Sequence, residues 1–119
     1  MLLDLDGKHV NRNPHREEYN SWCSRISDED FQAMEQAINN YCDRHNEIRS
    51  SFIPGKDETI KRLFPTLTEA CNGNEEDAGL FFGNIVWRVV DGRADSWYFK
   101  PSDRDDEHSL GMFYWKKDR

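Results

Sequence analysis

The most restrictive feature of this sequence is an almost uninterrupted apolar segment from Ala78 to Val90. The segment follows Asn74, a residue type that caps helix N-termini, and acidic residues at 75–77 that suit the positive end of a helix dipole. Its apolar side chains recur at helical spacing, so we predict a helix, with a buried strand over 80–90 as the alternative. Because this helix would be apolar on nearly every side, we expect it to be the central and most buried element.

Two further helices are predicted before this segment. The first begins after Ser27, a good N-cap, and should end before the turn-forming pair Pro54-Gly55. The second covers residues 57–72, where Pro65 should produce a kink or divide the pattern into two short helices. The apolar stripe of the first helix consists of Phe31, Met34, Ile38, Tyr41, Cys42 and His45.

The N-terminal region is expected to contribute little regular structure. Residues 2–10 hold two short apolar pieces around Asp6-Gly7, which predicts a turn or a small hairpin. Residues 11–21 are polar and predict an irregular segment.

The C-terminal region predicts a β-hairpin. Residues 96–100 and 110–117 are rich in aromatic side chains, and a charged loop separates them. Strict alternation places Trp97, Phe99, Phe113 and Trp115 on one face, which should cover the helices. The opposite face is expected to meet solvent or a partner and consists of Ser96, Tyr98, Lys100, Met112, Tyr114 and Lys116.

Together these patterns predict an α+β fold, in which three to four helices pack on a C-terminal antiparallel aromatic β-hairpin or small sheet. The chain has 119 residues, of which 36% are hydrophobic, and this suffices for one core but not for two. We therefore expect a single domain over residues 1–119.

The charge and the cysteines restrict the partners and the environment. The net charge of −7, without a cluster of basic residues on one face, argues against nucleic acid as a partner. No apolar run is long enough for a transmembrane helix, so no membrane partner is expected. Cys23 and Cys71 have no closely spaced ligand beside them, and Cys42 has only His45. The odd cysteine count and this spacing predict a reduced, cytoplasmic protein without metal or cofactor.

The N-terminal residues Leu2 to Lys8 contain an Asp-x-Asp-Gly sequence that resembles the first motif of the haloacid-dehalogenase-type phosphatases. The resemblance implies Asp4 as the nucleophile, Asp6 as the general acid/base and Mg²⁺ as the cofactor. That family has Thr after the glycine, where Lys8 stands here, and its fold needs parallel strands that this chain does not predict. We therefore favour a simple turn at Asp6-Gly7.

The predicted central helix carries two polar residues, Asn84 and Arg88, one turn apart on a thin polar stripe. An arginine on such a helix must be paired, most simply with Glu76, Asp77 or Asp91. The alternative is an anion-binding site.

The candidate binding residues are therefore Tyr98, Met112, Tyr114, Lys116, Asn84 and Arg88. In the absence of a convincing catalytic set, they favour a non-enzymatic protein-interaction module over an enzyme. Such a module would resemble a small bacterial accessory or inhibitor protein, and we expect self-association, most simply a homodimer, or binding to another protein. The alternative function is a small Mg²⁺-dependent phosphatase-like hydrolase that uses Asp4 and Asp6.

Overall fold

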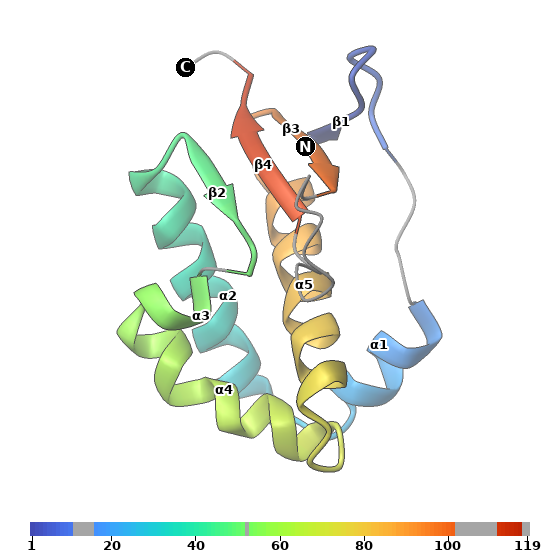
Figure 1. The fold of residues 1–119 in the computed structure, drawn as a ribbon, viewed down its shortest axis with the longest axis vertical. Coiled ribbons are helices and arrows are strands. Elements are labelled where there is room, and N and C mark those ends of the chain that lie inside the picture. The colour runs from blue at the N-terminus through green and yellow to red at the C-terminus, as the bar shows by residue number, and fades with distance from the viewer. Residues whose placement is uncertain (11–15, 52, 102–111, 118–119) are drawn as a thin grey trace.

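The computed structural model describes residues 1–10, 16–51, 53–101 and 112–117, and these ranges contain five helices and four strands. In chain order they are β1 (Leu2–Leu3), α1 (Arg16–Cys23), α2 (Asp28–Arg44), β2 (Glu47–Arg49), α3 (Ile53–Lys56), α4 (Glu58–Ala70), α5 (Glu75–Gly92), β3 (Trp97–Pro101) and β4 (Met112–Lys116). The sheet lies over the C-terminal half of α5 (Figure 1). The predicted α+β class is confirmed.

The sheet is mixed and has the strand order β1-β3-β4-β2. The predicted hairpin is its centre, because β3 and β4 pair antiparallel. β2 adds to β4 antiparallel, and β1 adds to β3 in parallel. Residues 110 and 111, which the sequence placed in the second strand, lie outside the described residues. The hairpin thus becomes a four-stranded sheet because two short segments far away in sequence pair with its edges.

Helix α5 is the most deeply buried helix, as its sequence predicts. The Asn74 side chain caps it by accepting a hydrogen bond from the Asp77 N–H, with an N···O distance of 3.0 Å. Trp87 is buried and packs edge-on against Phe99 of β3, with ring centroids 4.7 Å apart. The strand alternative for residues 80–90 is therefore wrong, and α5 joins the helices to the sheet.

Helices α2 and α4 begin where local capping chemistry predicts. Ser27 Oγ accepts a hydrogen bond from the Asp30 N–H at 3.1 Å, and the Asp57 carboxylate caps α4 in the same way. Helix α4 continues through Pro65, so the expected division into two helices is wrong. Pro65 is exposed, while the apolar side of α4 is buried. That burial offsets the hydrogen bond that proline cannot donate.

Two segments are more regular than the sequence predicts. Residues 16–21, expected to be irregular, belong to α1, because Tyr19 and Trp22 lie three residues apart and both pack against Phe81. Helix α2 ends well before Pro54, and the intervening residues form the edge strand β2. Short elements of this kind depend on tertiary packing, since isolated helices and strands of such length are marginal in water.

The faces of β4 are the reverse of those predicted. Phe99 pairs with Tyr114, and Tyr98 pairs with Trp115. Directly paired residues share one face of a sheet, so alternation fixes the faces within each strand, but the register decides which faces coincide. The core-facing set is therefore Trp97, Phe99, Met112, Tyr114 and Lys116, and the set on the outer face, away from the core, is Tyr98, Lys100, Phe113 and Trp115.

Candidate functional site

The register separates the hairpin residues that the sequence grouped as a contact surface. Tyr114 is fully buried in the core, and Met112 packs against that core. Lys116 lies on the same side, with its Nζ 5.4 Å from the centroid of the Trp97 ring. Only Tyr98 lies on the outer face. The predicted grouping of these residues on one face is therefore wrong.

Three aromatic rings form a contiguous cluster on the outer face. The centroids of Tyr98 and Trp115 are 5.6 Å apart, and those of Phe113 and Trp115 are 5.5 Å apart. All three side chains remain partly exposed. Arg49 Cζ and Lys100 Nζ lie 5.3 and 6.0 Å from the Phe113 centroid, within the range of cation–π contacts. We call these five residues the aromatic face.

The aromatic face has the composition of a contact surface. Aromatic residues and arginine are enriched at the centres of protein interfaces, where their burial gives most of the binding energy. The helices pack against the opposite side of the sheet, where Trp97 and Tyr114 join the common core. The sequence pattern identified an aromatic face in this hairpin but assigned the wrong β4 residues to it.

The predicted pair Asn84 and Arg88 forms a second candidate site, between α1 and α5. Asn84 is buried, and its amide nitrogen donates to the Leu80 carbonyl oxygen at 2.9 Å. Its amide oxygen accepts a hydrogen bond from Arg88 Nη1 at 3.0 Å. The Arg88 guanidinium also covers the Tyr19 ring, with Cζ 3.6 Å from the ring centroid. The structure thus brings both predicted residues together and adds Tyr19 from α1.

The ion pair expected for Arg88 is not formed within the described ranges. None of the salt bridges among these residues includes Arg88. Asp91, one of its three expected partners, instead accepts a hydrogen bond from the Leu2 N–H and contacts His9 Nε2, each at 3.0 Å. Asp91 thus attaches β1 and the following turn to the end of α5 and is not paired with Arg88.

Burial shifts the ionisable groups around Arg88 towards their neutral forms. It lowers the pKa of Arg88, and it raises the pKa of the Cys23 thiol, the Glu35 carboxyl and the Tyr19 hydroxyl. The positive charge of Arg16, at the start of α1, contributes to the lowered pKa of Arg88. A thiol that stays protonated is a poor nucleophile, so this cluster suits binding better than covalent catalysis.

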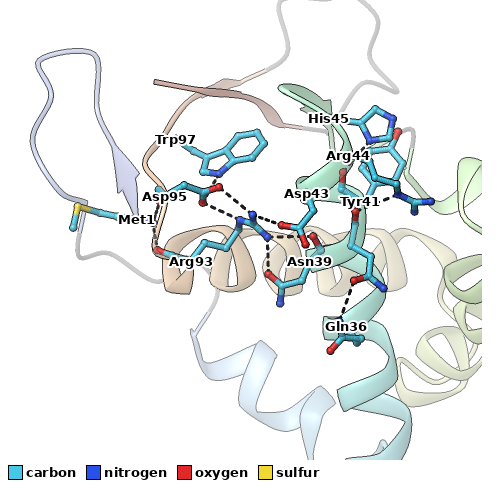
Figure 2. A network of polar contacts seen from close by, with 11 residues as sticks. Met1, Gln36, Asn39, Tyr41, Asp43, Arg44, His45, Arg93, Asp95 and Trp97 are labelled. Carbon is cyan, nitrogen blue, oxygen red and sulfur yellow. Dashed lines mark hydrogen bonds and ion pairs between the residues drawn. The ribbon is translucent and has the colours of Figure 1, made fainter. Parts of the chain in front are cut away.

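Arg93, just after α5, is the centre of a polar network that the sequence did not single out (Figure 2). Its Nε and Nη2 donate to the two carboxylate oxygens of Asp95 at 2.9 and 3.0 Å. Nη2 also donates to Asp43 at 2.6 Å, and Nη1 donates to the Asn39 amide oxygen at 2.9 Å. Trp97 Nε1 donates to Asp95 at 2.9 Å. All three guanidinium nitrogens are occupied by the protein itself, so this network joins α2, α5 and β3 and has a structural role.

The Asp-x-Asp-Gly sequence forms the turn that we favoured. Asp4 Oδ1 accepts hydrogen bonds from the N–H groups of Asp6 and Lys8, at 2.9 and 3.0 Å. Gly7 has a φ of 82°, which glycine adopts without strain. Within the described ranges, no group of three or more His, Cys, Asp or Glu side chains is arranged to hold a metal ion. The Asp4 carboxylate thus caps its own turn, and the alternative function of a hydrolase that uses Asp4 and Asp6 stays a prediction.

The cysteines and the helices give two further findings. Cys23, Cys42 and Cys71 are all free thiols. Across the part of the chain that the structure describes, no helix combines the length and the apolar character needed to cross a bilayer.

Comparison with known proteins assigns no family to the chain. No protein family, no curated protein and no solved structure matches it. The functional conclusions therefore rest on the geometry of the aromatic face and of the Arg88 cluster.

Proposed function

We propose that this protein is a non-enzymatic interaction module whose aromatic face binds a second copy of the same chain. The observation that carries the proposal is the contact of Tyr98, Phe113 and Trp115 on the outer face, where all three rings are partly exposed. Burying partly exposed aromatic area against another apolar surface is favourable in proportion to the area removed from water.

The charges around the aromatic face favour a second copy as the partner. Glu47 lies opposite Trp115 in the sheet, and Arg49 lies opposite Phe113. A two-fold axis that runs across the strands, within the interface, would place Glu47 of each copy over Arg49 of the other. The same operation would stack Phe113 of one copy over Trp115 of the other. The surface is therefore self-complementary in the placement of its charges and its aromatic rings, as a two-fold interface requires.

The test is the concentration dependence of the molar mass, measured by sedimentation equilibrium. We expect a dimer at high micromolar concentration, and Trp115→Glu should weaken it by about tenfold or more. The matched control is Glu69→Arg, a charge change at an exposed position near the end of α4, which should leave the dimer intact. Circular dichroism and the melting temperature establish that each variant is folded.

Charge reversal provides a second measurement. Glu47→Arg or Arg49→Glu alone should weaken the dimer, and the two changes together should restore it. A wild-type protein that stays monomeric, or a dimer unaffected by Trp115→Glu, would overturn the proposal. Binding of a single-stranded oligonucleotide to a monomer, seen as quenching of tryptophan fluorescence, would also overturn it and assign the aromatic face to base stacking.

A further inference from the structure

The described residues contact the Arg88 guanidinium group at one edge and on one face, and they make no hydrogen bond to its other edge. Nη1 donates to Asn84, and the guanidinium plane covers the Tyr19 ring. Within the described ranges, Nε and Nη2 have no hydrogen-bond acceptor and no carboxylate partner. These two nitrogens form the side-on fork that binds two oxygens of an anion at once.

We propose that Arg88 anchors a binding site for an oxyanion, a carboxylate or a phosphate group. Each feature of its surroundings supports this function. Asn84 is fixed by its own hydrogen bond to Leu80, so its oxygen sets the position of the guanidinium. The Tyr19 ring, itself packed edge-on against Phe81, supports the guanidinium from one side. Such preorganisation reduces the entropy lost on binding.

The charges near Arg88 also favour an anion. Arg16 contributes a second positive charge, which is close enough to disfavour the charged form of Arg88. An added anion between these cations would relieve this repulsion. Glu35 of α2 and the Cys23 thiol are the other titratable groups near Tyr19, and burial favours the protonated form of each. Within the described ranges, neither group forms a hydrogen bond or a salt bridge with Arg88.

The absence of an internal carboxylate partner within the described residues distinguishes Arg88 from Arg93. Arg88 lies within α5 and Arg93 directly follows it, and both are partly buried, yet Arg93 is saturated by Asp43, Asp95 and Asn39. Burying the charge of an arginine costs free energy unless an anion is paired with it. Arg88 is held in place without an internal carboxylate, and this favours an anion supplied by a ligand.

The site is tested by titrating the wild-type protein with inorganic phosphate and, separately, with acetate. The readouts are the melting temperature and the ¹⁵N–¹H signal of Arg88 Nε. We expect at least one anion to raise the melting temperature and to shift the Nε signal. Comparing phosphate with acetate identifies the class of oxyanion that the site prefers.

Three variants make the result specific. Arg88→Gln should weaken binding by about tenfold or more, since it removes the charged fork. Arg62→Gln, at an exposed position on α4, is the matched control and should bind as the wild type does. Asn84→Asp keeps the size of the side chain and gives Arg88 an internal carboxylate, so it should also weaken binding by about tenfold in a folded protein.

Two outcomes would overturn the proposal. One is that neither anion shifts the Nε signal of wild-type Arg88 at millimolar concentration. The other is that Asn84→Asp and Arg88→Gln both bind the anions as well as the Arg62→Gln control does. The Nε signal reports on Arg88 itself, and the melting temperatures are compared at one protein concentration, so failure here is distinguishable from failure of the aromatic face to self-associate.

Discussion

Removing the hydroxyl group of Tyr114 should stabilise this protein. The Tyr114 side chain has no solvent exposure, and among the residues that the structure describes its hydroxyl oxygen has no hydrogen-bond partner. Burial raises the pKa of this hydroxyl well above its ordinary value, which reflects the same apolar surroundings. Most buried tyrosine hydroxyls have a partner, and their removal is usually destabilising. Tyr114 should show the opposite sign.

The magnitude follows from the cost of an unsatisfied buried polar group. Such a group costs about 1–3 kcal/mol, because it loses water without gaining a partner. Tyr114→Phe keeps the ring and removes only one oxygen atom, so the small void that it leaves offsets little of this gain. We expect the free energy of unfolding to rise by about 1–2 kcal/mol. For a chain of this length, that corresponds to a melting temperature higher by about 4–8 °C.

The measurement is urea denaturation followed by circular dichroism, with thermal unfolding as a check. Tyr98→Phe is the matched control, because Tyr98 lies on the outer face and is partly exposed. Its effect should remain within about 0.5 kcal/mol. If Tyr114→Phe destabilised the protein by 1 kcal/mol or more, the hydroxyl would have a partner in solution, and the reasoning from its isolation would be wrong.

Two further predictions concern the polar network and the buried thiol. Arg93→Ala should lower the free energy of unfolding by on the order of 3 kcal/mol, since it removes the guanidinium partner of Asp95 and Asn39 and leaves Asp95 with Trp97 Nε1. An Arg93→Lys variant that is as stable as the wild type in urea would show that the planar guanidinium fork is unimportant. Burial raises the pKa of Cys42 from its ordinary value of 9.0 to about 11. Between these pH values the unfolded chain loses a proton that the folded chain keeps, so stability should fall as the pH rises, by on the order of 2–3 kcal/mol in all. Cys42→Ala should flatten this slope in denaturation curves recorded at pH 8 to 11, and an unchanged slope would contradict the assignment.

The starts of α2 and α5 and the end of α4 are the parts of the fold that the sequence predicts best. Ser27 and Asn74 cap α2 and α5 as expected, and Asn72 and Gly73, with φ of 58° and 80°, end the pattern of α4. Each of these features depends on a hydrogen bond or a backbone preference within three or four residues. Local chemistry of this range can be recognised without knowing the rest of the fold.

The candidate sites were only partly predictable for the same reason. Asn84 and Arg88 are four residues apart on one helix, so their contact follows from helical spacing. The aromatic ring beneath Arg88 comes from α1, and no pattern in the sequence relates Tyr19 to it. The network of Arg93 likewise depends on Asp43, fifty residues away in the chain.

The sequence by itself determined the class of the fold, the central helix and the presence of an aromatic hairpin. The tertiary structure alone decided the register of that hairpin, the addition of β1 and β2, and thus which aromatic rings face outward. Alternation acts between neighbours in one strand, whereas register is the sum of contacts between strands and with the core beneath them. Tyr114 is buried and Trp115 is partly exposed because the core accepts only one of the two faces of β4, and a change of one residue in register would exchange them.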